Sequence, residues 1–426
     1  MRRPPARGLL LELALLAVLI ATLWPLPGEQ SEQWIGCIVC GNDGVADVLR
    51  NVILFVPFGA ALALNDWDLA PSALAGGLLS ACVECAQFYI PGRDASLGDV
   101  ASNTLGATLG AVVIRTAPAW LSPVSTRAVR LSRAAALAAV AVCCVTGALS
   151  VPSLPSSLYY GMWTPNLGHL EWYRGRVVDA TIAGLHVTPG PIADSRLVRA
   201  LLAPANGMSL HVRAVAGPRT VALGPRFAIY DDRQREIALL GPDRGDLVFR
   251  VRTRAAALHL DQADIRLVEG MLGGTIGDTL DITVAGGSSG GRGYRMVLNS
   301  RSESGLGPSV GSGWALLMYS EALPAWCKTL LGAVWLGVVF LPTGFWMRTR
   351  RDVLFASGAL AVGLAAVPAL TSLVATSLLQ WVAAMIGVLA GAGLHAVSSG
   401  SLSGAARWRR GATAWTSWRT QRSIRE

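Results

Sequence analysis

Five polar residues with regular spacing lie where two apolar segments of this chain meet. They are Glu84, Gln87, Arg93, Asp99 and Asn103: two carboxylic acids, two amides and one guanidinium. The first two are three residues apart and the last two are four apart, so each pair lies on one helix face. Ionisable groups inside apolar helices are energetically costly, and they usually face a cavity or protein interior where they mark function.

Two more polar residues, Asp47 and Asn51, stand four residues apart at the start of an earlier apolar segment. Glu84 lies six residues before Ile90. At a rise of about 1.5 Å per residue, it is about 9 Å from that end of its helix. We therefore expect one ligand-binding site in this half of a four-helix unit, made of seven residues: Asp47, Asn51, Glu84, Gln87, Arg93, Asp99 and Asn103.

The residue types leave three kinds of role open for this cluster. Two carboxylates in one site can act as a general acid and a general base, so Glu84 and Asp99 are candidates for catalysis, although neither is assigned that role. The planar fork of Arg93 suits an anionic headgroup, or it can stabilise one of the two carboxylates. The same side chains can also hold helices together through hydrogen bonds and ion pairs.

The motifs around these residues resemble a known family. They are E-x-x-Q at 84–87, P-G-R at 91–93, D-V-x-x-N-x-x-G-A-x-x-G from Asp99, and the run from Asp47 to Gly59. Over about residues 8–116 this pattern is similar to the VanZ-like family of bacterial membrane proteins. That family takes its name from a glycopeptide resistance protein, and the resemblance implies no particular reaction.

Composition independently indicates a membrane protein. Of the 426 residues, 52% are hydrophobic and 15% are charged, and the mean hydropathy is +0.46. A soluble protein of this size is usually less apolar and more charged. About 20 apolar residues suffice to cross a bilayer. Such runs predict about eight spans, at 8–26, 50–64, 71–90, 98–114, 134–151, 325–346, 353–370 and 374–397.

The net charge of +9 reports topology rather than nucleic-acid binding. Arginines gather on alternate loops, whereas the loops at 27–48 and 371–373 carry no basic residue. This positive-inside pattern predicts a bacterial inner-membrane protein with both termini cytoplasmic and residues 152–322 extracytoplasmic. The arginines concerned are Arg2, Arg3, Arg7, Arg115, Arg127, Arg130, Arg133, Arg348, Arg350, Arg351, Arg407, Arg409, Arg410, Arg419, Arg422 and Arg425.

Residues 152–322 contain no spanning run and instead show strand-like alternation. Leu247, Phe249 and Val251 fall on one face of a predicted strand, with charged residues on the other. Short strands separated by Gly and Pro turns favour an antiparallel sandwich, similar in pattern to concanavalin-like or laminin-G-like jelly rolls. Strands are predicted at 209–215, on both sides of a turn within 226–240, and at 246–254, 279–284, 294–298 and 314–319.

The expected organisation has four parts: a VanZ-like helical domain plus a fifth span at 1–151, the sandwich at 152–322, further transmembrane helices at 323–397, and a basic cytoplasmic tail at 398–426. Cys37 and Cys40 lie in the first outward loop, where they could form a disulfide or a redox dithiol. The other cysteines, Cys82, Cys85, Cys143, Cys144 and Cys327, lie in apolar spans or at their ends, where they are expected to be small buried residues. No histidine cluster completes a metal site. No cofactor motif is present.

These features favour recognition of a cell-envelope component, either a lipid headgroup or a glycan, by a protein in contact with the bilayer. The first alternative is a membrane-embedded enzyme that acts on an envelope lipid through Glu84 or Asp99. The second is a transporter, although the sequence shows no duplicated halves with broken helices.

Overall fold

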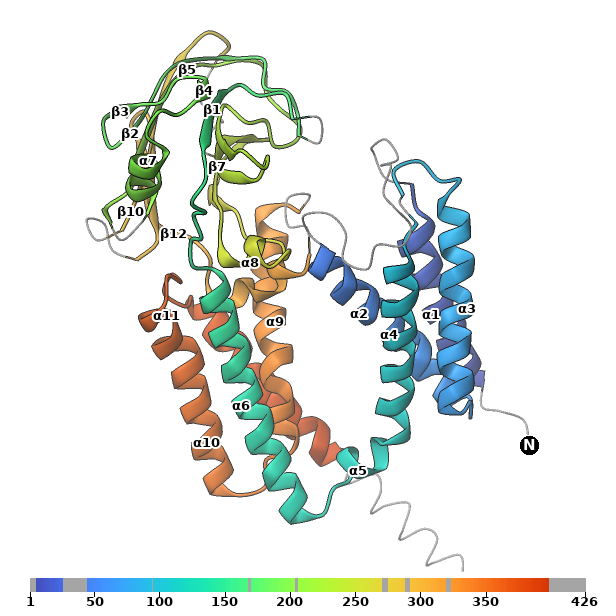
Figure 1. Cartoon of the computed structure of the whole chain (residues 1–426). Coiled ribbons are helices and arrows are strands. Elements are labelled where there is room, and N and C mark those ends of the chain that lie inside the picture. Colours follow the sequence, from blue (N-terminus) through green and yellow to red (C-terminus); the bar gives the residue numbers. More distant parts are fainter. Residues whose placement is uncertain are drawn as a thin grey trace, which may run out of the picture.

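The computed structural model describes residues 5–25, 44–93, 95–167, 170–203, 206–269, 275–287, 292–318 and 323–397. Figure 1 shows two groups of helices with an all-β part at one end. The cysteines Cys37 and Cys40 and the basic tail at 398–426 lie outside the described residues. The protein is thus a multi-pass helical membrane protein with an inserted β-sandwich.

Seven helices among the described residues are long and apolar enough to cross a membrane. They are α2 (Gly44–Leu64), α3 (Leu69–Gln87), α4 (Leu97–Arg115), α6 (Ser125–Leu149), α9 (Ala325–Phe345), the segment Arg350–Leu370 and the last described helix, Leu378–Val397. The first predicted span is also helical, as α1 (Pro5–Leu23), and α5 (Ala117–Leu121) is a short connection. The segment Arg350–Leu370 consists of α10 (Arg350–Ala361), a π-helical turn η3 (Val362–Ala366) and α11 (Val367–Leu370).

Helices α1 to α4 form one group, in which α2 and α4 touch through their backbones. A side chain at Gly59 would collide with the backbone of Ala107, and one at Gly110 would collide with the carbonyl of Val56. Small residues at such positions let membrane helices approach closely and pack by van der Waals contact. The pair α2–α4 therefore forms a close-packed unit, and it carries four residues of the predicted cluster: Asp47, Asn51, Asp99 and Asn103.

The second group contains α6, α9, the segment Arg350–Leu370 and the last helix. Here α9 and the last helix make the same kind of backbone contact, because side chains at Gly344 and Gly391 would collide with the carbonyls of Val388 and Leu341. The Ser132 hydroxyl of α6 donates to the Thr343 carbonyl of α9 at 2.9 Å. This group is therefore a second close-packed unit.

The all-β part consists of two antiparallel sheets of six strands each. One sheet has the order β4-β1-β6-β7-β8-β9 and the other β12-β11-β10-β5-β2-β3. As predicted, Leu247, Phe249 and Val251 face the shared core. The strands are β1 (Tyr159–Trp163), β2 (Arg176–Ile182), β3 (Leu185–His186), β4 (Gly190–Pro191), β5 (Ser209–Val215), β6 (Phe227–Asp231), β7 (Glu236–Asp243), β8 (Asp246–Val251), β9 (Ile265–Leu267), β10 (Thr279–Gly286), β11 (Tyr294–Leu298) and β12 (Arg301–Leu306).

The strand predicted at 314–319 is wrong. The segment Val310–Leu316 forms a 3₁₀ helix, η2, at the base of the sandwich. Gly311 and Gly313 let this helix lie directly against Gln380 and Trp335 of the helical part, so tertiary packing overrides the apolar strand-like pattern. The sequence also did not indicate two short helices, α7 (Ser195–Leu202) and α8 (Arg254–Ala257).

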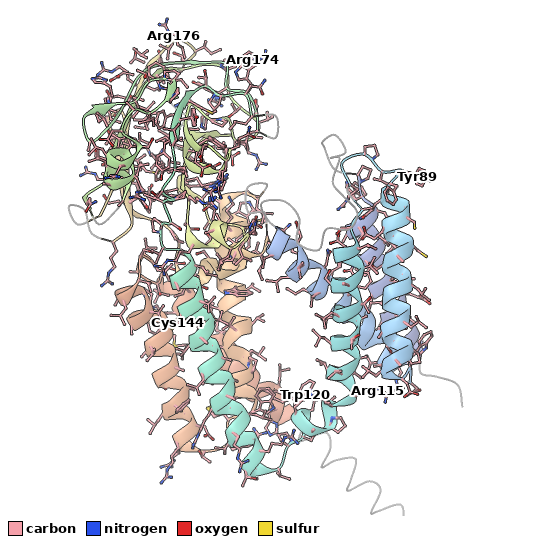
Figure 2. All side chains as sticks on the ribbon, in the orientation of Figure 1. Tyr89, Arg115, Trp120, Cys144, Arg174 and Arg176 are labelled. Carbon is pink, nitrogen blue, oxygen red and sulfur yellow. The ribbon has the colours of Figure 1, made fainter. Side chains whose placement is uncertain are left out.

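The sandwich stands at the same end of the helices as the turn between α3 and α4 (Figure 1). It touches the first helical group through the start of α2, where the backbone N–H groups of Val45 and Ala46 both donate to the His259 carbonyl at 3.1 Å. The start of α1, the short helix α5 and the turn between α9 and α10 lie at the opposite end. Side chains cover the sandwich and both helical groups in Figure 2, which also shows Arg115 at the opposite end.

Candidate functional site

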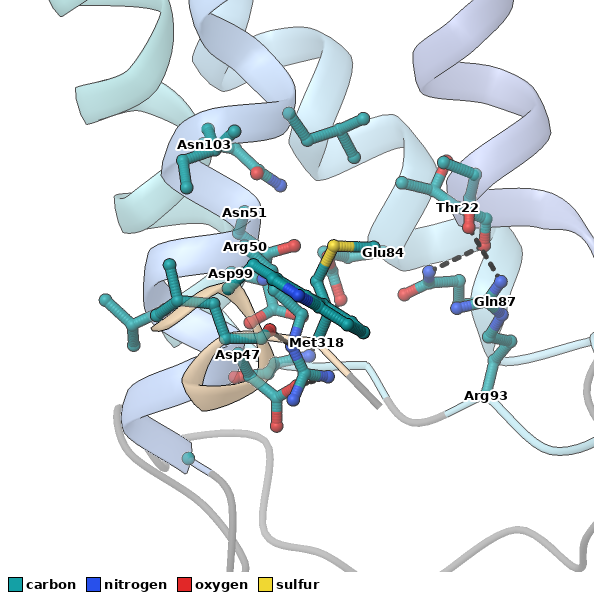
Figure 3. A pocket seen from close by; sticks show the side chains of 18 of the residues that line it. Thr22, Asp47, Arg50, Asn51, Glu84, Gln87, Arg93, Asp99, Asn103 and Met318 are labelled. Carbon is teal, nitrogen blue, oxygen red and sulfur yellow. Dashed lines mark hydrogen bonds and ion pairs between the residues drawn. The ribbon is translucent and has the colours of Figure 1, made fainter. Parts of the chain in front are cut away.

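A cavity of about 870 Å³ lies between the first helical group and α9 with η2. All seven residues of the predicted cluster line it: Asp47, Asn51, Glu84, Gln87, Arg93, Asp99 and Asn103. Figure 3 shows them around one space, together with Thr22, Arg50 and Met318. The helices therefore bring together side chains that are up to 56 positions apart in the sequence.

Glu84 lies in the last turn of α3, where the chain is about to turn into α4. Its carboxylate accepts a hydrogen bond from the backbone N–H of Ser96 at 2.8 Å. The Ser96 side chain in turn caps α4 by accepting from the Gly98 N–H at 3.0 Å. Glu84 is buried, so one of its oxygens holds the α3–α4 turn at the edge of the cavity.

Asp99 lies in the first turn of α4 and lines the same cavity. The side chain of Asn51, from α2, hydrogen-bonds to this carboxylate. Among the described residues, neither Asp99 nor Glu84 forms an ion pair. The cavity thus holds two carboxylates that no protein cation neutralises within the described part of the chain.

The two amide residues are the most enclosed members of the cluster, with Gln87 6% exposed and Asn103 1% exposed. The Gln87 amide donates to the Thr22 carbonyl at 2.9 Å, and the Asn103 amide donates to the Ser80 hydroxyl at 2.9 Å. The remaining oxygens of both amides, Gln87 Oε1 and Asn103 Oδ1, are buried and accept no hydrogen bond in the structure. Buried polar atoms are normally hydrogen-bonded, so each of these exceptions requires an explanation.

Arg93 pairs with no carboxylate of the described residues, contrary to one of the expectations for it. Its guanidinium donates to the carbonyls of Trp24 at 3.0 Å and Ala21 at 2.7 Å, at the end of α1. These carbonyls carry the negative end of the helix dipole, which attracts a cation. Partial burial lowers the pKa of Arg93 below its ordinary value. Arg93 therefore fastens the α3–α4 turn to α1.

Arg50 is the residue that the sequence prediction missed. From α2 it donates to Asp47 at 2.9 Å, to Asp261 of the sandwich part at 2.8 Å and to the Leu317 carbonyl at 2.6 Å. The spacing of Asp47 and Arg50 indicates an ion pair on one helix face. The other two partners lie more than 200 positions away, so only the folded chain reveals that Arg50 joins the cavity wall to the sandwich.

The wall opposite the carboxylates is mainly apolar. It is formed by α9 and η2 with the residue pair after it: Trp314, Leu317, Met318, Leu331, Val334, Trp335 and Val338. Val334 and Val338 line the cavity and are also 52% and 60% exposed, so the cavity opens sideways where lipid would surround the helices. The buried indole nitrogen of Trp335 donates no hydrogen bond in the structure.

The aromatic residues at the start of the sandwich are mostly structural. The Trp163 indole donates to the Val187 carbonyl at 3.0 Å. Tyr173 is buried, its hydroxyl accepts from the Gly217 N–H at 2.8 Å, and its ring lies 4.6 Å from the Arg226 guanidinium. Trp172 is exposed. Of these three, only Trp172 is placed so that a sugar could stack on it.

Comparison with known proteins identifies the first helical group. A family model described as VanZ/LLP1 matches residues 11–118, which run from α1 through α4 into α5. No curated protein and no solved structure matches the chain. The match covers the helices that carry all seven predicted residues, whereas the sandwich and the second helical group lie outside it. The protein is therefore a membrane protein whose first four helices are similar to the VanZ/LLP1 family, and we call these helices the VanZ-like unit.

Proposed function

We propose that this protein recognises a lipid component of the bacterial cell envelope and holds its headgroup in the cavity without reacting with it. The observation that carries the proposal is the division of the cavity into two walls. The VanZ-like wall presents carboxylates and amides, and the α9 wall presents leucine, valine and tryptophan side chains. A headgroup attached to an apolar chain matches both walls, since ligand sites combine an apolar lining with a few placed polar groups.

The sideways opening supports a ligand that arrives from the bilayer. Ile53 of α2, together with Val334 and Val338 of α9, lines the cavity and is more than half exposed. An acyl or isoprenyl chain can lie along these side chains while its headgroup reaches Glu84 and Asp99. A soluble metabolite would not need such an apolar approach.

The proposal places the cavity in the outer half of the inner membrane. The polar residues lie toward the helix ends that adjoin the sandwich, and the arginine-rich loops gather at the other end. Reporter fusions at Gly217 and at the C-terminus test this topology. The two fusions should report opposite compartments, with Gly217 outside; the same compartment for both would refute it.

In this scheme the sandwich is the extracytoplasmic part, and it binds a glycan or a protein partner next to the cavity. Its contact with α2 through Asp261 and Arg50 supports a shared task, because the same arginine lines the cavity. The exposed Trp172 offers a ring on which a sugar can stack.

Mass spectrometry of lipids that copurify with the full chain tests the proposal. The protein should carry one lipid species in stoichiometric amount, enriched over the membrane average. The Glu84→Gln/Asp99→Asn double variant should lose it. The control is Glu12→Gln, which removes an exposed carboxylate of α1 that does not line the cavity.

Two results would overturn recognition without chemistry. If no lipid is enriched in the wild-type protein, the cavity holds none. If the lipid is chemically altered by the wild-type protein but not by the double variant, the protein is an enzyme that uses Glu84 or Asp99 as acid or base.

A further inference from the structure

The cavity wall around Glu84 and Asp99 has more unused hydrogen-bond acceptors than donors. Its two lining cations are already engaged: Arg93 donates to two carbonyls of α1, and Arg50 donates to Leu317, Asp47 and Asp261. One donor is left over on the opposite wall, the Trp335 indole N–H, whereas the groups left over on the side of Glu84 and Asp99 are acceptors. They comprise the two carboxylates and the unpartnered oxygens Gln87 Oε1 and Asn103 Oδ1.

The orientation of the Gln87 amide follows from its partner. Its nitrogen must face the Thr22 carbonyl, because a carbonyl only accepts hydrogen bonds. Its oxygen therefore faces the other way. In Figure 3 the Gln87 amide extends from α3 with its oxygen on the side of Glu84. This buried acceptor belongs to a residue that lines the cavity, and it lies on the side of the Glu84 carboxylate.

An anionic headgroup would add negative charge next to two carboxylates that no described cation neutralises. A buried charge without a partner is strongly unfavourable, and like charges in a low-dielectric site repel. A primary ammonium group has the opposite properties: one positive charge and three N–H donors in a compact shape. It would neutralise a carboxylate and also donate to an amide oxygen.

Building on the proposed function, we infer that the headgroup recognised by the cavity carries a primary ammonium group, which lies between Glu84, Asp99 and the Gln87 oxygen. The ammonium can belong to an ethanolamine phospholipid or to an aminoacylated lipid. A phosphate is not the group that enters the carboxylate end.

Thermal stabilisation of the full chain by defined lipids tests this inference. Detergent-purified, delipidated protein is titrated separately with four dioleoyl lipids: phosphatidylethanolamine, lysyl-phosphatidylglycerol, phosphatidylcholine and phosphatidylglycerol. Phosphatidylcholine is the matched control for the first, because it keeps the charge but has no N–H donor. Hydrogen bonds to charged groups predict that at least one primary-ammonium lipid binds about tenfold more tightly than the other two.

The outcomes separate the ligand class from the proposed function. Preference for phosphatidylethanolamine or for lysyl-phosphatidylglycerol supports the inference and identifies the source of the ammonium. Tighter binding of phosphatidylglycerol, or equal binding of all four lipids, overturns it while leaving recognition of another lipid intact. A copurified lipid without any amine also overturns it. If no lipid binds and none copurifies, the proposed function fails as well.

Two variants locate the preference in the cavity. In Glu84→Gln and in Asp99→Asn, the advantage of the ammonium lipid over phosphatidylcholine should shrink to less than about threefold, since its N–H groups then donate to a neutral amide oxygen instead of a carboxylate. Glu12→Gln should keep the wild-type preference. Retention of the full preference in both cavity variants would place the ammonium elsewhere and contradict the inference.

Discussion

The sandwich and the VanZ-like unit differ in whether their enclosed carboxylates form ion pairs. In the sandwich, Asp264 is almost completely buried between two arginines, with Arg250 and Arg266 each at 2.9 Å. Asp231 is likewise buried and is paired with Arg235 at 2.6 Å. In the VanZ-like unit, Glu84 and Asp99 line a cavity and form no ion pair with any described residue.

Under the proposed function, this difference distinguishes charges that stabilise the fold from charges that are available to a ligand. Removing one partner of a buried ion pair leaves an uncompensated charge and destabilises the protein. Removing a carboxylate that has no cationic partner among the described residues relieves such a cost. The same substitution chemistry should therefore have opposite effects in the two regions.

The largest effect is expected in the sandwich. Arg266→Met leaves Asp243 and Asp264 without this arginine, and should lower the free energy of unfolding by about 3–5 kcal/mol. Differential scanning fluorimetry of the full chain in detergent measures the shift. The control Arg213→Met removes an exposed partner of Asp281 and should cost about 0–1 kcal/mol. Equal shifts would mean that burial does not distinguish these pairs.

Acidification should affect the sandwich next most strongly. Burial alone would raise the pKa of Asp264, but Arg250 and Arg266 outweigh it and hold that pKa below its ordinary value. Burial alone would likewise raise the pKa of Asp231, but hydrogen bonds from Arg235 and Arg233 outweigh it, so the pKa of Asp231 is also lowered. A lowered native pKa contributes stability that is complete above the unfolded value, near pH 3.9, and is lost as pH falls through the native value.

Unfolding followed between pH 7 and pH 2 measures this loss. The melting temperature of the sandwich transition should fall below about pH 4, since Asp264 and Asp231 then take up protons on unfolding. The Asp264→Asn variant should start from a lower melting temperature and lose less of it with acid. A variant with the full wild-type acid dependence would exclude Asp264 as a source.

A smaller effect is expected from Arg93→Ala. This change removes two solvent-exposed hydrogen bonds from a cation to the carbonyls of Trp24 and Ala21, which together should be worth about 1.5–3 kcal/mol. Because Arg93 does not touch Glu84 or Asp99, its effect should add to that of Glu84→Gln within about 0.5 kcal/mol. A double-mutant cycle on unfolding measures the coupling. A larger coupling would mean that Arg93 does neutralise Glu84.

The smallest effect on stability, and the one that sharpens the comparison most, is that of Glu84→Gln. Glutamine keeps an oxygen for the Ser96 N–H and removes an uncompensated charge. Stability of the ligand-free protein should stay within about 1 kcal/mol of wild type or rise. The same unfolding measurement checks this, with Asp99→Asn as the parallel case. A loss of several kcal/mol would show that the carboxylate has a structural partner.

Much of this architecture could be predicted from the sequence, because apolar runs and residue alternation within single segments determine it. Apolar runs placed the seven spans, and alternation placed strands such as Ser209–Val215 at their observed positions. Helical spacing within each segment, with short turns between segments, sufficed to group the seven cavity residues. The amide and carboxylate positions therefore follow from periodicity alone.

The remainder depends on contacts between distant parts of the chain. The apolar wall from α9 lies more than 200 positions after the polar residues, and no local pattern relates the two. Arg93 looks like the partner of a carboxylate in the sequence, but the carbonyls at the end of α1 are closer in the fold. Trp314 reads as part of a strand, but packing against Trp335 turns its segment into a 3₁₀ helix.

The glycine contacts determine how the cavity can change shape. Because α2 touches α4 backbone to backbone, and α9 touches the last helix in the same way, we expect each pair to move as one rigid body. The α2–α4 pair borders the cavity on one side and α9 borders it on the other. The described links between the two bodies include Arg50 with Leu317 near the sandwich and Trp346 with Trp120 near the other end. We expect the cavity opening to widen by rotation of the two bodies about these two contacts, without bending of the helices. The sandwich should then tilt when a ligand enters the cavity.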